Sequence, residues 1–227
     1  MKRVEKIFDS CDARIISRSR LPKLIFDFIE GATGREIAAN ANVNSFNEVK
    51  LLPRALIDVS ERSLSTSFMG EKFCLPFGIA PMGMCNLAYP NADILMAKIA
   101  KERNFPHCIA TATSTNLEEV YSAGEDKSWF QLYVLNGPER GLELAKIAQS
   151  IGYKTLILTV DVPQAARRLR ELRNGFNVPF KIGMSQFIDF AIHPVWSIRT
   201  LSAGIPKPVL FQNEDNKFER TANRMGA

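Results

Sequence analysis

The chain has 227 residues, of which 46% are hydrophobic, and a formal net charge of +5. This length and composition allow one sizeable hydrophobic core with a small appendage. The mildly basic balance suits an anionic ligand or an anionic membrane surface, and we expect no nucleic-acid partner. The sequence has no run of about 18 apolar residues, so it predicts no membrane-spanning helix.

The cysteines and the N-terminus indicate the compartment. Cys11, Cys74, Cys85 and Cys108 show no C-x-x-C spacing, which argues against a metal site and against a disulfide framework. Free thiols are typical of the reducing cytoplasm. The first residues are charged and lack the apolar region of a secretory signal. We therefore expect a cytoplasmic protein without a bound metal.

Residues 1–74 predict an N-terminal extension made of helices and a hairpin. Residues 4–31 are predicted to be helical because their apolar side chains recur at helical spacing. Residues 38–46 predict a second, short helix. Residues 64–76 predict a hairpin with Gly70-Glu71 as its turn. None of these segments carries chemistry by itself.

From residue 75 onward, strand-like and helix-like segments alternate. Thr115–Glu118 predicts a capping box at one helix start, and Gly152 predicts the end of another helix. Four strand–helix units in series predict a parallel sheet in an α/β fold. The predicted strands are 75–80, 108–113, 129–134 and 155–161, and the helical segments between and after them include 92–99, 144–151 and 164–174.

The loop after the first predicted strand separates two architectures. A doubly wound sheet normally has a glycine-rich phosphate loop there. This chain instead reads Ala80-Pro81-Met82-Gly83-Met84, which contains neither G-x-G-x-x-G nor G-K-[ST]. We therefore favour a TIM (β/α)8 barrel, in which active sites lie at the carboxyl ends of the strands.

Two predicted strands end in polar pairs that suit such a site. Gln131 and Tyr133 are two residues apart on the third strand, and Thr159 and Asp161 are two apart on the fourth. Residues two apart point to the same side of a strand. The sequence therefore predicts that both pairs lie at one rim of the barrel.

The chain changes character after residue 183. Residues 184–213 are apolar and interrupted by prolines, so we predict an irregular segment over 184–227. A complete barrel takes about 250 residues. Residues 75–183 provide about four strand–helix units, and we interpret them as the first half of a barrel in a longer protein.

Short motifs follow one another in a characteristic order between residues 20 and 180. They are Leu-Pro-Lys at 21–23, Phe-Asp-Phe-Ile-Glu-Gly-Ala at 26–32, Leu-Leu-Pro-Arg-Ala-Leu-Ile-Asp-Val at 51–59, Leu-Pro-Phe-Gly-Ile-Ala-Pro at 75–81, Leu-Glu-Glu-Val at 117–120, Trp-Phe-Gln-Leu-Tyr-Val at 129–134 and Leu-Thr-Val-Asp-Val-Pro at 158–163. In this order and spacing, the chain resembles the FMN-dependent 2-hydroxy acid oxidases and dehydrogenases. That family includes glycolate oxidase, L-lactate dehydrogenase and mandelate dehydrogenase.

The resemblance implies a TIM barrel that holds FMN at its C-terminal rim. The flavin ring would lie against the backbone of Pro81, Met82 and Gly83. Gln131 and Thr159 would hydrogen-bond the polar edge of the ring, which tunes its electron affinity. From the residues alone, Gln131 and Thr159 also suit polar groups that satisfy each other inside the barrel.

The resemblance also implies substrate roles. Tyr133 would hydrogen-bond the hydroxyl oxygen of an L-2-hydroxy acid, and Arg168 would grip its carboxylate in a forked pair. Asp161 would orient and charge-balance a catalytic histidine, with a helix N-cap as its alternative role. The reaction would yield a 2-oxo acid and pass two electrons to FMN.

Three positions depart from the family pattern. Phe28 stands where the family usually has a tyrosine that helps bind the substrate carboxylate, and phenylalanine cannot donate that hydrogen bond. Ala110 replaces a serine that commonly contacts the flavin, so a hydroxyl is lost. Ala112 replaces a tryptophan in the active-site wall of glycolate oxidase, which would open the pocket to a larger substrate side chain.

The family's general base, a histidine in a His-Gly pair, has no counterpart in this sequence. The two histidines are His107, which follows Pro106, and His193, which lies in His-Pro-Val-Trp. The lysine near the flavin, a second substrate arginine and the phosphate-binding loops also belong to the second half of the family's barrel. We therefore expect these residues alone to be inactive and poorly folded, with open sheet edges.

Residues 183–212 resemble a segment that aids peripheral membrane attachment in relatives such as mandelate dehydrogenase. A loop packed on the barrel or on a neighbouring subunit is the alternative. The segment contains an apolar cluster with an interfacial tryptophan, formed by Phe187, Ile188, Phe190, Ala191, Ile192, Val195, Trp196 and Ile198.

Two functions follow from these residues. The leading one is FMN-dependent oxidation of a lactate-, glycolate- or mandelate-type acid, with oxygen, a quinone or a cytochrome as the electron acceptor. The enzyme would be a homo-oligomer in the cytoplasm or on the inner face of the membrane. The alternative is a catalytically inactive paralogue that acts as a binding subunit. The departures at Phe28 and Ala110 mildly favour the alternative. Retention of the polar residues expected at the site argues against it; these are Gln131, Tyr133, Thr159, Asp161 and Arg168.

Overall fold

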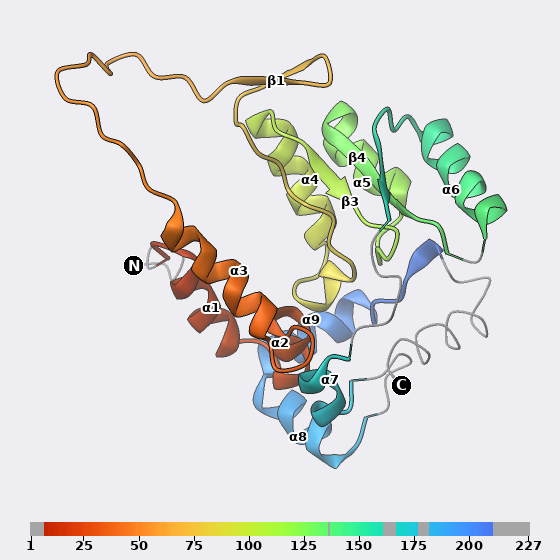
Figure 1. The fold of residues 1–227 in the computed structure, drawn as a ribbon. Coiled ribbons are helices and arrows are strands. Elements are labelled where there is room, and N and C mark those ends of the chain that lie inside the picture. Colours follow the sequence, from red (N-terminus) through yellow and green to blue (C-terminus); the bar gives the residue numbers. More distant parts are fainter. Residues whose placement is uncertain (1–6, 136, 161–166, 177–181, 211–227) are drawn as a thin grey trace.

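The computed structural model describes residues 7–135, 137–160, 167–176 and 182–210 (Figure 1). Its helices form two groups. The helices α4, α5 and α6 lie beside the strands in the upper part of Figure 1, and α1, α2, α7, α8 and α9 gather in the lower part. This division separates the sheet from a helical layer that contains both early and late segments of the chain.

The N-terminal helices are α1 (Ser10–Arg18), α2 (Lys23–Glu30) and α3 (Ile37–Ser45), followed by the short 3-10 helix η2 (Phe46–Glu48). The continuous helix predicted over residues 4–31 is therefore two helices in the described part of that range. Pro22 is the N-cap residue of α2, with φ −53° and ψ 146°. The helix α1 has already ended at Arg18, with Ser19 as its C-cap, and the extended conformation of Pro22 starts α2. Proline suits a helix start because it has no N–H to donate.

An extended arm, residues 49–65, leads from α3 to the hairpin β1 (Thr66–Phe68) and β2 (Glu71–Phe73) (Figure 1). The predicted hairpin is confirmed, but its turn is Met69-Gly70, one residue earlier than predicted. Both turn residues have positive φ, 51° and 82°. A two-residue hairpin loop favours that conformation because it matches the twist of the strands.

The main sheet is parallel, with strand order β3-β4-β5. Its strands are β3 (His107–Ile109), β4 (Ser128–Tyr133) and β5 (Leu156–Thr159), and its helices are α4 (Ala92–Arg103), α5 (Leu117–Gly124) and α6 (Pro138–Ile151). The 3-10 helices η3 (Cys85–Leu87) and η4 (Glu125–Lys127) precede α4 and β4. The predicted alternation of parallel strands and helices is thus confirmed for these elements, with shorter strands.

The first predicted strand, residues 75–80, was wrong as a buried strand. Only Ile79 joins the sheet, through an isolated parallel bridge to His107. Ile79 donates to Pro106 O at 2.9 Å, and Cys108 donates to Ile79 O at 3.0 Å. Pro106 has no N–H, so the ladder cannot continue past it toward Gly78.

The core lies where the helices pack on the sheet. Its buried side chains come from α4, β3, α5, β4 and α6, whereas β5 contributes none. They include Ala97, Ile109, Leu117, Val120, Phe130, Leu132, Leu144 and Ala148. Tyr153, which follows α6, joins this core and donates its hydroxyl to Leu117 O at 2.8 Å. The predicted end of α6 at Gly152 is confirmed, since Gly152 is its C-cap with φ 123°.

The segment predicted to be irregular contains two helices, α8 (Met184–Ile192) and α9 (Pro194–Ala203), which follow α7 (Leu169–Asn174). Pro194 was read as a breaker, but it occupies the first turn of α9, where a missing N–H costs nothing. Among the described residues, none of the helices is long and apolar enough to cross a membrane.

Candidate active site

The polar ends of β4 and β5 touch, as the sequence predicts. Tyr133 pairs in register with Thr159 across the two parallel strands. Gln131 Nε2 donates to Thr159 Oγ1 at 2.8 Å. Three of the four predicted rim side chains therefore belong to one edge of the sheet. The fourth, Asp161, lies outside the described residues.

A second threonine fixes Gln131. Thr111 N donates to Gln131 Oε1 at 3.0 Å, and Thr111 Oγ1 donates to Gln131 O at 2.6 Å. Tyr133 N in turn donates to Thr111 Oγ1 at 2.9 Å. Both Gln131 and Thr111 are buried. Sequence reasoning missed Thr111; its signal was a hydroxyl at the end of an apolar strand, between Ala110 and Ala112.

These bonds leave donors for a ligand. They use the oxygen of the Gln131 amide and one N–H, and they use Thr159 Oγ1 as an acceptor. A primary amide has a second N–H, and a hydroxyl that accepts still has its own proton. The polar edge of a flavin ring presents acceptor oxygens and nitrogens, so this pair fits it. If Gln131 and Thr159 only satisfied polar groups inside the barrel, the hydrogen bonds described above would use only part of what the two side chains can donate.

The loop that follows Ile79 lies at the same rim. Met84 N donates to Ala112 O at 3.0 Å, which ties this loop to the end of β3. A Cβ atom on Gly83 would lie 3.1 Å from the Ala112 Cβ, so glycine allows the close approach. Pro81 is half-buried, whereas Met82 and Gly83 are exposed. An exposed backbone segment with a glycine leaves room for the face of a planar ring.

A buried carboxyl group holds the loop between β3 and α5. Asp93 Oδ2 accepts from Thr113 Oγ1 at 3.1 Å and from Thr115 Oγ1 at 2.9 Å. Asp93 Oδ1 has no hydrogen-bond partner among the described residues. Burial raises the pKa of Asp93, and the threonine hydrogen bonds oppose that shift. The predicted capping box was wrong, because Thr115 bonds Asp93 and the N-cap of α5 is Asn116.

Arg168 contacts the N-terminal extension. Its Nη2 donates to Phe28 O at 2.7 Å and to Gly31 O at 2.6 Å, and its Nη1 lies 2.5 Å from Glu171 Oε1. The guanidinium carbon is 5.4 Å from the centroid of the Phe28 ring. That ring stacks on Phe176 at 4.6 Å. No hydrogen bond between described residues links Arg168 to the pair on β4 and β5.

Neither histidine occupies the place of a general base at this rim. His107 starts β3, at the opposite end of the strand, and is 1% exposed. Burial lowers the pKa of His107 to about 4, so it is neutral near pH 7. His193 lies between α8 and α9, where its Nδ1 is 2.7 Å from Asp189 O. Both positions are structural.

The chain is similar to known flavoenzymes. A family model described as FMN-dependent dehydrogenase matches residues 17–226. (S)-mandelate dehydrogenase of Pseudomonas putida is 31% identical over 204 residues, which cover 89% of this chain and 51% of that protein. 4-hydroxymandelate oxidase of Amycolatopsis orientalis is 35% identical over 176 residues, covering 78% and 49%. The chain thus spans about half the length of the curated relatives it matches.

Solved structures agree with this fold. The structure titled monotopic membrane protein (S)-mandelate dehydrogenase superposes with a TM-score of 0.89 at 30% identity, covering 97% of this chain and 60% of that one. Mandelate oxidase with (S)-4-hydroxymandelic acid gives a TM-score of 0.70 at 34% identity, covering 77% and 48%. These neighbours are TIM-barrel flavoenzymes, and the described residues form part of such a barrel. By its sequence, its parallel sheet and its match over residues 17–226, the chain belongs to the FMN-dependent dehydrogenase family, whose members oxidise 2-hydroxy acids.

Proposed function

We propose that this chain contributes half of the active site of an enzyme that oxidises an L-2-hydroxy acid to a 2-oxo acid with FMN. The observation that carries the proposal is the 2.8 Å hydrogen bond from Gln131 to Thr159 across the ends of β4 and β5. When bound, FMN supplies a two-electron acceptor. Gln131 and Thr159 would donate to its polar edge, and the loop at Pro81–Gly83 would support its face.

The substrate roles rest on the same rim. Tyr133 is half-buried next to Thr159 and would donate to the substrate hydroxyl oxygen. Arg168 is held by Phe28 O and Gly31 O, and its Nε–H has no acceptor among the described residues. That donor would bind the substrate carboxylate. Asp161 would orient the catalytic histidine, which a second half of the barrel would supply.

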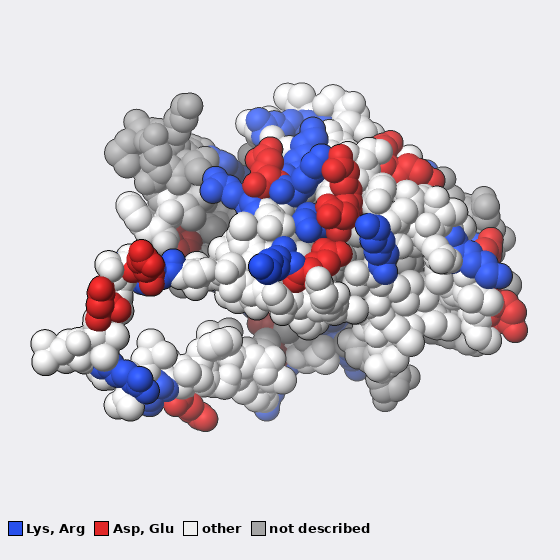
Figure 2. All heavy atoms as spheres, turned by 90° about the horizontal axis from the view of Figure 1, so that it is seen from above, with Lys and Arg blue, Asp and Glu red and all other residues white. Residues whose placement is uncertain are grey.

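The outer face of α8 and α9 supports peripheral membrane contact and a quinone as the electron acceptor. Ile188, Ile192, Val195 and Ile198 are all more than half exposed on these helices. A relative of closely similar fold is titled a monotopic membrane protein. On the face seen in Figure 2, which is viewed from above, basic and acidic side chains are interspersed, so that face has no single-sign patch that would suit a phosphate backbone. Flotation with vesicles tests this contact, and Ile192→Glu should abolish it.

The flavin assignment is tested by pairing the chain with a separately made C-terminal half of a homologous dehydrogenase. We expect the pair to retain FMN, seen by its absorbance, and an L-2-hydroxy acid to bleach it without oxygen. Thr159→Val should weaken FMN binding by about tenfold, because a hydrogen bond is lost. Thr155→Val, near the start of the same strand, is the matched control. Equal FMN binding by both variants would contradict the assignment.

A binding subunit without catalysis is the second candidate, and one contact favours it. The guanidinium of Arg168 is engaged by two carbonyl oxygens and by Glu171, so much of its donor capacity is used inside the chain. Under this alternative, the two halves would still associate, and FMN would neither be retained nor be bleached. The same reconstitution therefore separates the two functions.

A further inference from the structure

An apolar cavity of about 420 Å³ lies among the helices of the helical layer, with η3 on one side. Its walls come from α2, η3, α8, α9 and the segment after α9. This volume is in the range of ligand pockets, about 300–1,000 Å³. The side chains that line it most prominently are Leu24, Leu87, Phe187, Phe190, Trp196 and Leu201.

Most polar groups around this cavity already form hydrogen bonds with other protein atoms. Trp196 Nε1 donates to Leu87 O at 2.8 Å, and Ser197 Oγ donates to Phe190 O at 2.7 Å. Gln186 Nε2 donates to Asn174 O at 2.8 Å. The wall therefore offers water almost no hydrogen bonds. An apolar wall of this kind favours hydrocarbon over water.

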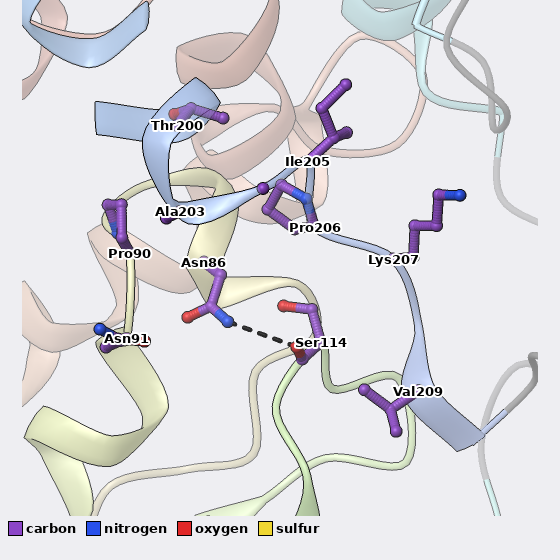
Figure 3. Close-up of a pocket in the computed structure, with 11 residues that line it drawn as sticks. Asn86, Pro90, Asn91, Ser114, Thr200, Ala203, Ile205, Pro206, Lys207 and Val209 are labelled. Atoms are coloured by element: carbon purple, nitrogen blue, oxygen red, sulfur yellow. Dashed lines mark hydrogen bonds between the residues drawn. The ribbon is translucent and has the colours of Figure 1, made fainter. Parts of the chain in front are cut away.

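The hydroxyl of Thr200 is the exception, because it has no such partner in the described part of the chain. Thr200 also lines a second cavity. It is 6% exposed, and its Oγ1 has no hydrogen-bond partner among the described residues. Thr200, Ile205 and Pro206 line both the larger cavity and a smaller one of about 240 Å³ (Figure 3). The two cavities thus share a wall at the C-terminal end of α9.

The smaller cavity has a polar lining, and none of the described residues that line it is acidic. Asn86, Asn91 and Ser114 line it opposite α9, and Lys207 lies at its edge (Figure 3). Ser114 Oγ is buried and, like Thr200 Oγ1, has no partner among the described residues. A buried hydroxyl without a partner costs free energy, which a ligand oxygen would recover. The two hydroxyls and the lysine cation together match an anionic head with acceptor oxygens.

We propose that these two adjacent cavities, which share Thr200, Ile205 and Pro206 as lining residues, together bind a monomeric, single-chain aliphatic carboxylate. The carboxylate would lie in the smaller cavity, where Thr200 and Ser114 donate to it and Lys207 balances its charge. The hydrocarbon chain would lie in the larger cavity. The site uses neither the flavin donors nor the substrate residues of the rim, so it stands independently of the proposed reaction.

The test measures binding of dodecanoate, kept below its micelle concentration, to the 227-residue chain by calorimetry and by Trp196 fluorescence. Thr200→Val and Lys207→Gln should each weaken binding about tenfold, since each removes a partner of the carboxylate. Ser202→Ala is the matched control, because Ser202 lies on the same helix and bonds only Arg199 O. Dodecanol, which has the same tail without the charge, should bind more weakly than dodecanoate.

A second measurement keeps the proposal independent of how a variant folds. Without ligand, Thr200→Val should raise the melting temperature, because it removes an unpartnered buried hydroxyl. Ala191→Phe, at the wall of the larger cavity, should block dodecanoate while leaving the far-UV circular dichroism unchanged. The proposal is overturned if Thr200→Val and Lys207→Gln bind dodecanoate as the parent does. It is equally overturned if the chain binds acyl chains only in vesicles.

Discussion

Three threonine hydroxyls connect the loops at the rim of the sheet to one another. Thr111 connects the end of β3 to Gln131 and Tyr133 on β4. Thr113 and Thr115 connect the following loop to Asp93 at the start of α4. Because each hydroxyl both donates and accepts, the end of β3 is fixed relative to its neighbours on both sides. Gln131 and Thr159, which we propose as flavin donors, are therefore preorganised by these contacts.

The buried carboxyl group of Asp93 gives the first prediction at this scale. Burial raises its pKa above the ordinary value of 3.8, so the folded state holds this proton more tightly than the unfolded chain. Stability is therefore fully present below that ordinary value and is lost as the pH rises through the raised pKa. Asp93→Asn keeps an acceptor for Thr113 and Thr115 without the charge. Relative to the parent, it should gain stability as the pH rises above 3.8, the ordinary value.

Urea titrations of parent and variant at several pH values measure this difference. His107 contributes in the opposite sense: its lowered pKa, about 4, makes stability fall as the pH drops below the ordinary histidine value of 6.5. Both proteins contain His107, so the comparison between them isolates Asp93. Parallel pH profiles for the two proteins would show that Asp93 is ionised in the folded state.

How much of the site the sequence predicted depends on what each residue contacts. The contact between Gln131 and Thr159 was predictable, because side-chain alternation and parallel order place strand ends together. The role of Thr111 was not, because its partners lie on β4 and depend on register. Arg168 was predicted to face the substrate, yet its described contacts are Phe28 O, Gly31 O and Glu171. A long side chain such as that of Arg168 can reach several hydrogen-bond partners, and the spacing of residues along the sequence does not show which partner it binds.

Helices and strands were predicted correctly where local sequence signals decide their ends, and incorrectly where a neighbouring segment decides them. The end of α6 was predicted correctly, because Gly152 is a local signal for it. The helix predicted over 92–99 is α4, which continues to Arg103. The strand predicted at 75–80 failed because Pro106, on its neighbour, cannot donate to the ladder. The helices α8 and α9 were missed because Pro194 was taken to interrupt the segment. Proline breaks a helix only in its interior, and its position relative to the helix start needs the structure.

The end of α6 gives a prediction for this scale. Gly152 has φ 123°, and a Cβ atom there would lie 2.6 Å from the Tyr121 ring. Gly152→Ala should therefore destabilise the chain by more than about 1 kcal/mol, from backbone strain and from displacement of the ring. Gly204→Ala is the matched control, because Gly204 has φ 87° and open space around its Cβ position. Thermal unfolding measures both variants, and equal losses would mean that the ring yields freely.

Across the whole molecule, large apolar side chains are exposed at the edge strand β5 and along the arm. Leu156, Leu158 and Val160 at β5 are exposed, and so are Leu51 and Leu56 on the arm. In the part of the chain that the structure describes, β5 has β4 as its one strand partner. An unpaired strand edge with exposed leucines favours association with another chain. These surfaces are the places where a second half of the barrel would pack.

A charge at this edge tests that arrangement. Leu158→Lys should make the isolated chain more soluble, because a lysine on an exposed strand disfavours edge-to-edge pairing. The same change should weaken pairing with the C-terminal half of a homologous dehydrogenase by about tenfold or more, since burying an unpaired charge is costly. Leu142→Lys is the matched control, because Leu142 is similarly exposed on the outer face of α6. Sedimentation velocity reports both self-association and pairing. If Leu142→Lys and Leu158→Lys impair pairing equally, the β5 edge is not where the second half packs, and the half-barrel interpretation of this sheet fails.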